Sequence, residues 1–209
     1  MATVAEAETF VDAGFEDVRA AYPVMGRDKH ERLQALRDEA TISFTVDTVA
    51  GAEQASAVYA DADDPVEVLM EVDVGHGRCG VHWSDNTAAT TLARHIASLP
   101  GLRLAGILTH AGQAYDGPSD GETEEEALRR VARHERDRML SVVSTLTETE
   151  GLGVTPETFE ISVGSTPSMA AFENTARDGF RVTEIRPGNY VMHDAMQVAL
   201  GAADRKSVV

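Results

Sequence analysis

Two short loops of the chain have the composition of an anion-binding site. GSTPSM, residues 164–169, lies between an apolar run and a helix-like segment, and RPGNY, residues 186–190, follows the next apolar run. Gly164 lets the backbone approach a ligand closely, and Ser165 and Thr166 offer hydroxyl groups. Exposed amides at the start of a helix attract anions, so phosphate is the natural guest. The alternative is a capped helix without a ligand, because Ser and Thr are preferred N-cap residues.

Two further polar clusters also come directly after apolar runs. EVDVGHGRCGV, residues 71–81, places Arg78 among three glycines. THAGQAY, residues 109–115, offers His110 and Tyr115, which could equally be a histidine at the edge of the core and a tyrosine that packs there. The sequence contains no Cys or His spacing typical of a metal site and no GxSxG or GxxxxGK[ST] motif. The clusters therefore indicate ligand binding without identifying the ligand.

The elements that must position these clusters alternate regularly along the chain. Helix-like segments are followed by apolar runs of strand length, several of them apolar on both faces, as parallel strands buried between layers are. The expected helix and strand pairs are 4–14 with 18–24, 26–39 with 41–47, 50–62 with 66–75, 86–100 with 102–110, 125–151 with 159–165, and 168–177 with 182–190. This pattern predicts an α/β protein, either doubly wound or a (β/α)₈ barrel.

The polar clusters favour the barrel. They follow four successive strands, and the carboxyl ends of barrel strands form one ligand-binding edge. A barrel has eight strands and about 250 residues, whereas six strands are expected here. We therefore expect residues 1–203 to form a partial (β/α)₈ TIM barrel with six of the eight strands, two being absent at the front. Counted in this way, the two candidate phosphate loops follow strands seven and eight, which often build a phosphate site together.

Composition limits the partners. Thirty-five acidic residues against eighteen basic ones give a net charge of -17, which argues against nucleic acid or an anionic membrane as a partner. There is no apolar run long enough for a membrane span, and the first residues do not resemble an export signal. One cysteine, Cys79, fits a reducing cytoplasm. The acidic, lysine-poor composition also suggests a host that lives in high salt, a hypothesis that rests on charge screening alone.

Read as a set, five segments resemble a known enzyme family. ATVAEAE, EVDVGHGRCGV, GILTHAGQAY, VGSTPSM and EIRPGNYVMHDAMQ are similar, in this order, to the D-threonine aldolase and D-serine dehydratase family. These are pyridoxal-phosphate enzymes with an alanine racemase N-terminal-type barrel, and the resemblance covers residues 2 to about 203. It implies retro-aldol cleavage of D-3-hydroxy amino acids to glycine and an aldehyde, or dehydration of D-serine. The cofactor would serve as the electron sink.

The resemblance also implies a role for each motif. Arg78 would hydrogen-bond the phenolate oxygen of the cofactor ring. The loops at residues 164–169 and 186–190 would bind its phosphate, and His110 is a candidate on the substrate side. The implied cofactor site consists of Arg78, Tyr115, Gly164, Ser165, Thr166, Gly188, Asn189 and Tyr190.

The chain also departs from the family pattern. The family holds its cofactor as a Schiff base on a lysine near the first barrel strand, whereas the lysines here are Lys29 and Lys206, and neither follows a strand at the ligand edge. We therefore expect no catalytic lysine and no activity from this chain alone. The C-terminal β domain that carries the family's divalent-metal ligands is expected to be absent too, so no metal site is predicted. The full-length form would be a homodimer or a monomer.

Two other readings compete with an enzyme fragment. One is a non-catalytic pyridoxal-phosphate-binding protein on the same barrel, against which the missing lysine and first strand argue. The other is a phosphate-binding α/β domain unrelated to pyridoxal chemistry. Residues 204–209, DRKSVV, fit neither the family nor the composition, and they match the translation of the start of a common sequencing adapter. We expect them to be a non-native tail.

Overall fold

Six parallel strands form the body of the protein. The computed structural model describes residues 1–192 and 194–203, and in it the strands follow one another in the sheet in sequence order, β1-β2-β3-β5-β6-β7. Each neighbouring pair is parallel. The bounds are β1 Asp17–Pro23, β2 Thr41–Val46, β3 Val66–Asp73, β5 Leu102–Leu108, β6 Glu160–Val163 and β7 Glu184–Ile185, and the two-residue β4, Val81–His82, pairs with the end of β3. A sequential order without reversal belongs to a barrel and not to a doubly wound sheet. The predicted partial barrel with six strands is confirmed.

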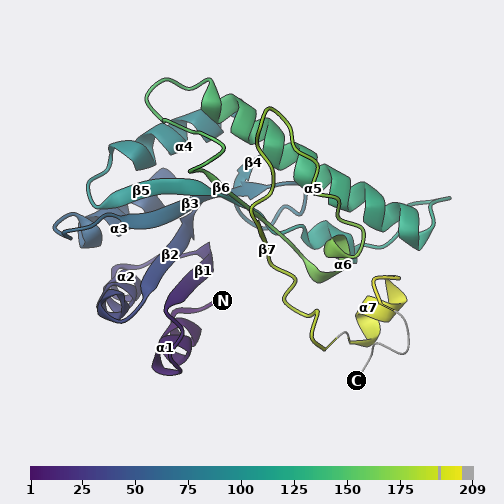
Figure 1. Cartoon of the computed structure of the whole chain (residues 1–209), viewed down its shortest axis with the longest axis horizontal. Coiled ribbons are helices and arrows are strands. Elements are labelled where there is room, and N and C mark those ends of the chain that lie inside the picture. The colour runs from purple at the N-terminus through teal and green to yellow at the C-terminus, as the bar shows by residue number, and fades with distance from the viewer. Residues whose placement is uncertain (193, 204–209) are drawn as a thin grey trace.

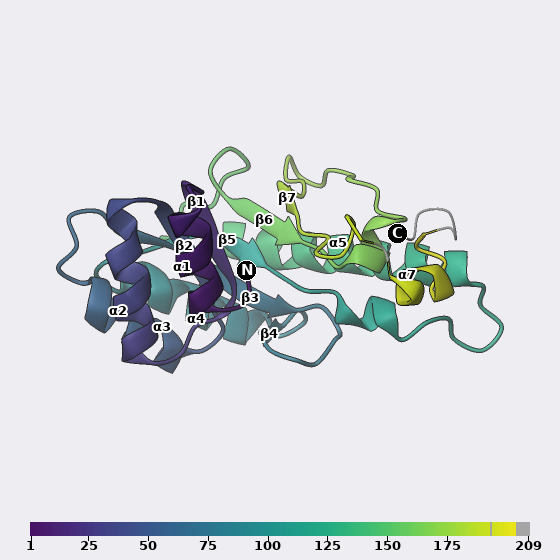
Figure 2. The same cartoon turned by 90° about the horizontal axis from the view of Figure 1, so that it is seen from below.

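The helices cover one side of this sheet. Helices α1 to α5 pack against one another in chain order and cover the outer side of the curved sheet (Figure 1). Figure 2 shows α1, α2 and α3 gathered at one end of the molecule, and α7 at the other. The helix bounds are α1 Val4–Asp12, α2 Arg27–Ala35, α3 Val49–Tyr59, α4 Asn86–Ser98, α5 Glu124–Thr147, α6 Thr166–Met169 and α7 Ala195–Ala199, with short 3₁₀ turns η1 Leu36–Asp38 and η2 Gly112–Tyr115.

The two faces of the sheet differ in chemistry. Side chains alternate along a strand, and the helix-facing set is apolar and buried, with Phe44, Met70 and Ile107 each fully enclosed. The opposite, concave face carries an ion cluster. Arg19 on β1 donates to Ser43 Oγ at 2.9 Å and to Glu184 Oε2 at 2.8 Å, and it also pairs with Glu160. Arg19 therefore links the first strand to the last two across the concave face.

Two expected elements are much shorter than the sequence pattern predicts. The predicted helix over 168–177 is wrong beyond α6, because Asn174 pairs its side chain with the backbone of Val182 and a turn with positive φ at Asp178 and Gly179 reverses the chain. The predicted strand over 182–190 pairs only at Glu184–Ile185. Pro187 has no amide proton for a ladder, so the chain leaves the sheet there.

One histidine of the charged segment 26–39 lies in the core. His30 on α2 has no exposed area, and its ring packs 5.0 Å from Phe44 and 6.0 Å from Tyr59, measured between ring centroids. The charged composition of α2 hides its apolar face, since His30 and Leu33 are its buried residues. Burial lowers the pKa of His30, so its ring is neutral and packs as an aromatic residue of the core.

Three further features concern the tail of the chain, membrane-spanning helices and metal ligands. The expected non-native tail, residues 204–209, lies outside the described residues. Within residues 1–192 and 194–203, no helix has both the length and the apolar character that crossing a bilayer requires. The same residues contain no group of three or more His, Cys, Asp or Glu side chains arranged to hold a metal ion.

Candidate functional site

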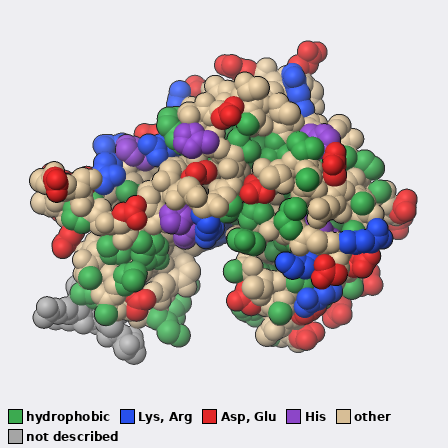
Figure 3. All heavy atoms as spheres, turned by 180° about the vertical axis from the view of Figure 1, so that it is seen from behind, with side chains coloured by type: hydrophobic (Ala, Val, Ile, Leu, Met, Phe, Trp, Pro, Cys, Tyr) green, Lys and Arg blue, Asp and Glu red, His purple; other side chains and the backbone are tan. Residues whose placement is uncertain are grey.

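The carboxyl ends of β3, β5, β6 and β7 bring the four polar clusters to one edge of the sheet. Asn189 N, after β7, donates to Thr166 Oγ1, after β6, at 2.8 Å. His110 Nδ1, after β5, lies 3.1 Å from Gly164 O. The His110 ring also meets the ring of His76, from the loop after β3, with centroids 5.8 Å apart. Seen from behind, a deep notch separates the part that carries α7 from the part that carries α1, and histidine and basic side chains gather at its head (Figure 3).

The loop of residues 164–169, called here the serine loop, is held from below by a buried carboxylate. Glu135 on α5 accepts a hydrogen bond from Gly164 N at 2.8 Å and another from Ser168 Oγ at 2.8 Å. Ser165 Oγ in turn lies 3.0 Å from Ser168 Oγ. Burial raises the pKa of Glu135 to about 7, although its two hydrogen bonds and the Arg186 cation oppose the rise. The amide of Gly164 is thus used inside the protein, and the Ser165 and Thr166 hydroxyls are also buried, bonded to Ser168 Oγ and to Asn189 N.

Gly164 is required by the close approach of two strands. Its φ is +145°, which side-chain-bearing residues rarely adopt, and a Cβ there would lie 2.6 Å from Arg186 N. Gly188 differs, since a Cβ at that position would meet nothing within 4 Å. The first glycine therefore sets how closely the serine loop and the turn at residues 186–190 pack together.

The loop of residues 74–80, called here the arginine loop, turns back over the end of β3. Gly75, Gly77 and Gly80 all have positive φ, and a Cβ on Gly80 would lie 2.7 Å from Asp73 N. Asp73 Oδ1 accepts from the amides of Gly75 at 2.8 Å and Gly77 at 3.0 Å. The glycines thus allow a tight reversal that places Arg78 at the edge of the sheet, as a guanidinium that stays charged at all relevant pH values.

His110 has a fixed tautomer and is neutral. Because Gly164 O can only accept, His110 Nδ1 must carry the proton of their 3.1 Å hydrogen bond. Burial first, and then the nearby Arg78 cation, lower the pKa of His110 to about 4. Its Nε2 is therefore an unprotonated acceptor at neutral pH.

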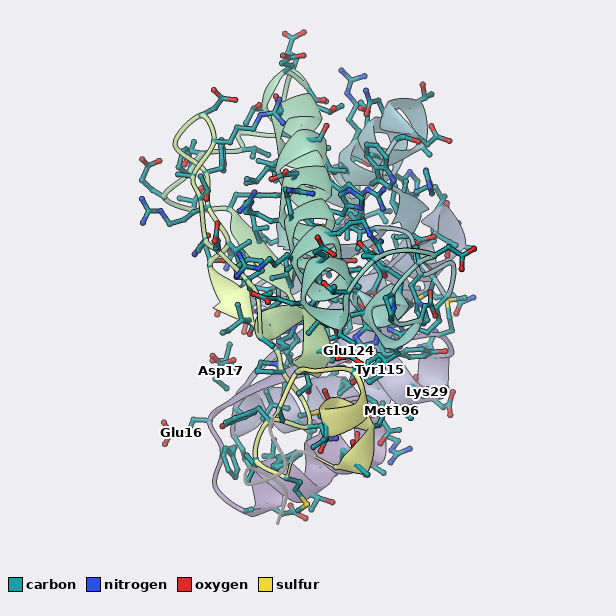
Figure 4. All side chains as sticks on the ribbon, turned by 90° about the vertical axis from the view of Figure 1, so that its right-hand side faces the viewer. Glu16, Asp17, Lys29, Tyr115, Glu124 and Met196 are labelled. Carbon is teal, nitrogen blue, oxygen red and sulfur yellow. The ribbon has the colours of Figure 1, made fainter. Side chains whose placement is uncertain are left out.

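The other predicted residues are placed less uniformly. Tyr115 ends η2, and its hydroxyl accepts from Gln197 Nε2 on α7 at 3.5 Å. Figure 4 shows Tyr115 next to Met196, which also belongs to α7. Tyr190 directly follows Asn189 and is 60% exposed, so its role at the site stays a prediction.

Three charged side chains of the site were not singled out from the sequence. Glu71 on β3 and Glu135 on α5 are buried, and Arg186 donates to Ser162 Oγ at 2.7 Å and also to Thr109 O. One feature of the sequence could have revealed Glu71. It is a charged residue inside VEVLMEVD, a run whose apolar residues indicate a buried strand. Desolvation lowers the pKa of Arg186 and raises that of Glu71 to about 7.

The one lysine in the described part of the chain is remote from these groups. Lys29 lies in α2, two positions after the helix begins. Figure 4 draws it near Tyr115 in projection, but Figure 1 shows α2 on the opposite side of the molecule from α6 and α7. The described residues of the cluster therefore offer hydroxyls, amides, a guanidinium and a neutral imidazole, a donor set that suits a phosphorylated ligand.

The sequence and the fold match known proteins over nearly all of the chain. Residues 1–195 match the family described as alanine racemase, N-terminal domain. The chain is 31% identical over 208 residues to the D-threo-3-hydroxyaspartate dehydratase of Delftia sp. strain HT23, which covers 100% of this chain and 51% of that protein. It is 35% identical over 191 residues to the D-threonine aldolase of Arthrobacter sp., covering 91% of this chain and 46% of that enzyme.

Solved structures agree with these matches. The Delftia dehydratase superimposes with a TM-score of 0.83 over 99% of this chain and 51% of its own, at 31% identity. The D-threonine aldolase of Filomicrobium marinum does so with a TM-score of 0.78 over 100% of this chain and 52% of its own, at 27% identity. The chain spans about half the length of these enzymes. The match over residues 1–195, together with the sequential parallel strands, shows that the chain belongs to the alanine racemase N-terminal domain family, the fold type III pyridoxal-phosphate proteins.

Proposed function

We propose that this chain is the barrel portion of a pyridoxal-phosphate-dependent lyase that acts on D-3-hydroxy amino acids. The observation that carries the proposal is the meeting of two loops from successive strands, where Asn189 N donates to Thr166 Oγ1 at 2.8 Å. The relatives named D-threonine aldolase and D-threo-3-hydroxyaspartate dehydratase supply the substrate class. Both retro-aldol cleavage and dehydration remain within the proposal, since both begin on a D-amino acid with a 3-hydroxyl group.

The residues present fit the cofactor. The hydroxyls of Ser165 and Thr166 and the amides of the 188–190 turn would hold its phosphate. Arg78, in the loop that follows β3, would face the ring oxygen with its guanidinium. When bound, the cofactor supplies the electron sink for the bond that breaks.

His110 is the chain's candidate for contact with the substrate. Its Nδ1 proton is held by Gly164 O at 3.1 Å, so the ring cannot turn without losing that bond. Its free Nε2 can accept a hydrogen bond from a substrate hydroxyl at neutral pH, because the pKa of about 4 keeps the ring uncharged. We propose that His110 orients the 3-hydroxyl group in this way.

Residues 1–192 and 194–203 place no lysine beside the serine loop. Lys29 lies on α2, and Figure 1 shows this helix away from the serine loop. We therefore propose that the chain binds pyridoxal phosphate reversibly and does not cleave substrate alone. A lysine supplied on an additional strand would complete the reaction.

Two measurements test the proposal. Pyridoxal phosphate is titrated into the chain while the fluorescence of Trp83, the single tryptophan, is recorded. We expect saturable quenching that is weakened about tenfold by Thr166→Val, because one charge-assisted hydrogen bond is lost. The matched control is Thr87→Val, an exposed threonine of α4, which should leave the titration unchanged. Borohydride treatment followed by mass spectrometry should find no covalent adduct on Lys29.

A chimera tests the reaction itself. The matched half of the Arthrobacter D-threonine aldolase is replaced by residues 1–195 of this chain, and glycine formation is followed with D- and L-threonine. We expect turnover of the D-isomer only. A chain that fails to bind pyridoxal phosphate, or a folded and cofactor-loaded chimera without turnover, would contradict the proposal. Binding without turnover would support a non-catalytic binding protein.

A further inference from the structure

Glu71 is buried beneath the arginine loop with only part of its hydrogen-bonding capacity used. Its side chain is 1% exposed. Oε1 accepts from the Cys79 thiol at 3.6 Å and lies 3.8 Å from Arg78 Nη2. Oε2 makes no hydrogen bond of good geometry with the described residues, although the Thr45 hydroxyl, which has no other partner there, faces the carboxylate. An unpartnered oxygen on a buried carboxylate is costly, so its retention needs a reason.

Glu71 is a charged residue in an otherwise apolar part of β3, and its side chain faces polar groups. Leu69 and Met70, next to it on β3, are completely buried. An apolar side chain of similar volume would avoid the cost of taking a carboxylate out of water. Thr45 from β2, Arg186 from the end of β7, and Arg78 and Cys79 from the arginine loop are the polar groups that face it. Of these, Arg78 is the group with freedom to move, because 41% of its side chain is exposed.

The backbone of the arginine loop and the direction of its guanidinium are fixed separately. Asp73 anchors the backbone through the amides of Gly75 and Gly77. Nothing in that anchor directs the long, rotatable Arg78 side chain, and ordering such a side chain costs conformational entropy. Glu71 is the carboxylate placed to do so, since Arg78 Nη2 is 3.8 Å from Oε1. Charge-assisted pairs close to about 2.8 Å, and a planar guanidinium can use both carboxylate oxygens.

We propose that Glu71 is the positioning residue for Arg78, holding the guanidinium at the ligand edge through its buried carboxylate. The unpartnered Oε2 is the second acceptor of a two-oxygen grip that forms when Arg78 meets an anionic ring oxygen. The inference rests on the proposed function only for the ligand that Arg78 meets. The contact between Glu71 and Arg78 belongs to the chain itself.

The first test measures Arg78 without any ligand. Nitrogen-15 relaxation of the arginine Nε–Hε groups is recorded, with Arg78 assigned through Arg78→Lys. We expect the order parameter of Arg78 to fall below about 0.6, the range of flexible groups, in Glu71→Gln. Glu71→Asp, which keeps the charge, should restore part of the order. The control is Glu67→Gln, on the same strand, whose partner is Arg103 and which should leave Arg78 unchanged.

The second test adds the ligand. Trp83 fluorescence gives the dissociation constants of pyridoxal phosphate and of its analogue without the ring hydroxyl. Glu71→Gln should weaken binding of pyridoxal phosphate about tenfold, as when one charge-assisted contact is loosened, and should not change binding of the analogue. A merely structural role would weaken both ligands equally.

The outcomes separate the two ideas. An Arg78 order parameter that is the same in Glu71→Gln and in the wild type overturns the inference, whether or not pyridoxal phosphate binds. Loss of Arg78 order in Glu71→Gln together with no binding of pyridoxal phosphate by the wild type supports the positioning role and contradicts the proposed function. If Glu71→Gln does not fold, Glu71→Leu, an apolar side chain of similar volume, takes its place, and unchanged Arg78 order with unchanged discrimination against the analogue would overturn the inference.

Discussion

Glu71 and Glu135 are two buried carboxylates beneath the same edge of the sheet, and they are used differently. Burial raises the pKa of each to about 7. Both oxygens of Glu135 accept hydrogen bonds, from Gly164 N and from Ser168 Oγ, each at 2.8 Å. Glu71 has one oxygen near Cys79 and Arg78 and one without a partner in the described structure.

The difference indicates that Glu135 supports the serine loop, whereas Glu71 acts on a side chain that we propose contacts the ligand. A fully bonded carboxylate such as Glu135 fixes the backbone of the serine loop and has no oxygen free for a further partner. Glu71 meets a side chain that is 41% exposed, and its free oxygen can still take part when that side chain moves. Removing Glu135 should therefore cost stability, whereas removing the charge of Glu71 should change Arg78 and ligand binding.

The largest expected effect is on Glu135. Glu135→Ala leaves a buried amide and a buried hydroxyl without acceptors and opens a cavity, so we expect the free energy of unfolding to fall by about 4 kcal/mol. At about pH 4.5, Glu71→Gln should stay within about 1 kcal/mol of the wild type, because the amide then replaces a protonated carboxyl group of the same shape. Urea unfolding followed by Trp83 fluorescence measures both.

The control for this pair is Glu157→Ala, in an exposed loop, which should unfold with the wild type. Equal losses in Glu135→Ala and Glu71→Gln would mean that the two carboxylates do the same work. The comparison would then be wrong.

The backbone amide that Glu135 holds belongs to a glycine that cannot be replaced. Gly164→Ala would force a side chain into φ +145° and place its Cβ 2.6 Å from Arg186 N, so we expect a loss of about 3 kcal/mol. Gly188→Ala, in the facing turn, meets nothing within 4 Å and should cost less than about 1 kcal/mol. Urea unfolding checks the pair, and a tolerated Gly164→Ala would show that the two loops can separate.

The sequence predicts features that depend on residues close together in the chain, and it misses features that depend on contacts between distant residues. The order and direction of the strands followed from local apolar runs, and so did the gathering of Arg78, His110 and Thr166 at one edge. The prediction of a helix over 168–177 is wrong because the Asn174 side chain bonds to the backbone of Val182, eight positions along the chain. No local pattern reports such a contact.

The buried charges were missed for the same reason. Glu135 lies in the run EEALRRVARHERDR, where a charged residue looks like part of a solvated face, and only the packing of α5 against the serine loop turns it inward. His30 lies in a similarly charged run and is also buried, by packing against Phe44 and Tyr59.

The pH dependence of stability should separate the carboxylates from the histidine beside them. Because burial raises the folded pKa of Glu71 from 4.5 to about 7, the native state binds more protons than the unfolded state in that window. Its contribution to stability is present below about pH 4.5 and is lost as the pH rises to about 7. Relative to the wild type, Glu71→Gln should gain about 3 kcal/mol between these limits.

His110 supplies a control of opposite sign. Its folded pKa is lowered from 6.5 to about 4, so its contribution is present above about pH 6.5 and is lost as the pH falls towards 4. His110→Asn should therefore gain stability relative to the wild type on acidification. Unfolding curves from pH 4 to pH 8 measure both variants, and a change of the same sign in the two would contradict the assignment.

The smallest expected effect on stability is that of Arg78→Ala. The guanidinium is 41% exposed and its closest carboxylate contact is 3.8 Å, so we expect the free energy of unfolding to change by less than about 0.5 kcal/mol. Pyridoxal phosphate binding should nevertheless weaken about tenfold, because the residue is kept for its ligand. Arg27→Ala, an exposed arginine of α2, should change neither quantity. A large loss of stability in Arg78→Ala would make the pair of Arg78 and Glu71 a structural ion pair, and the contrast between Glu71 and Glu135 would disappear.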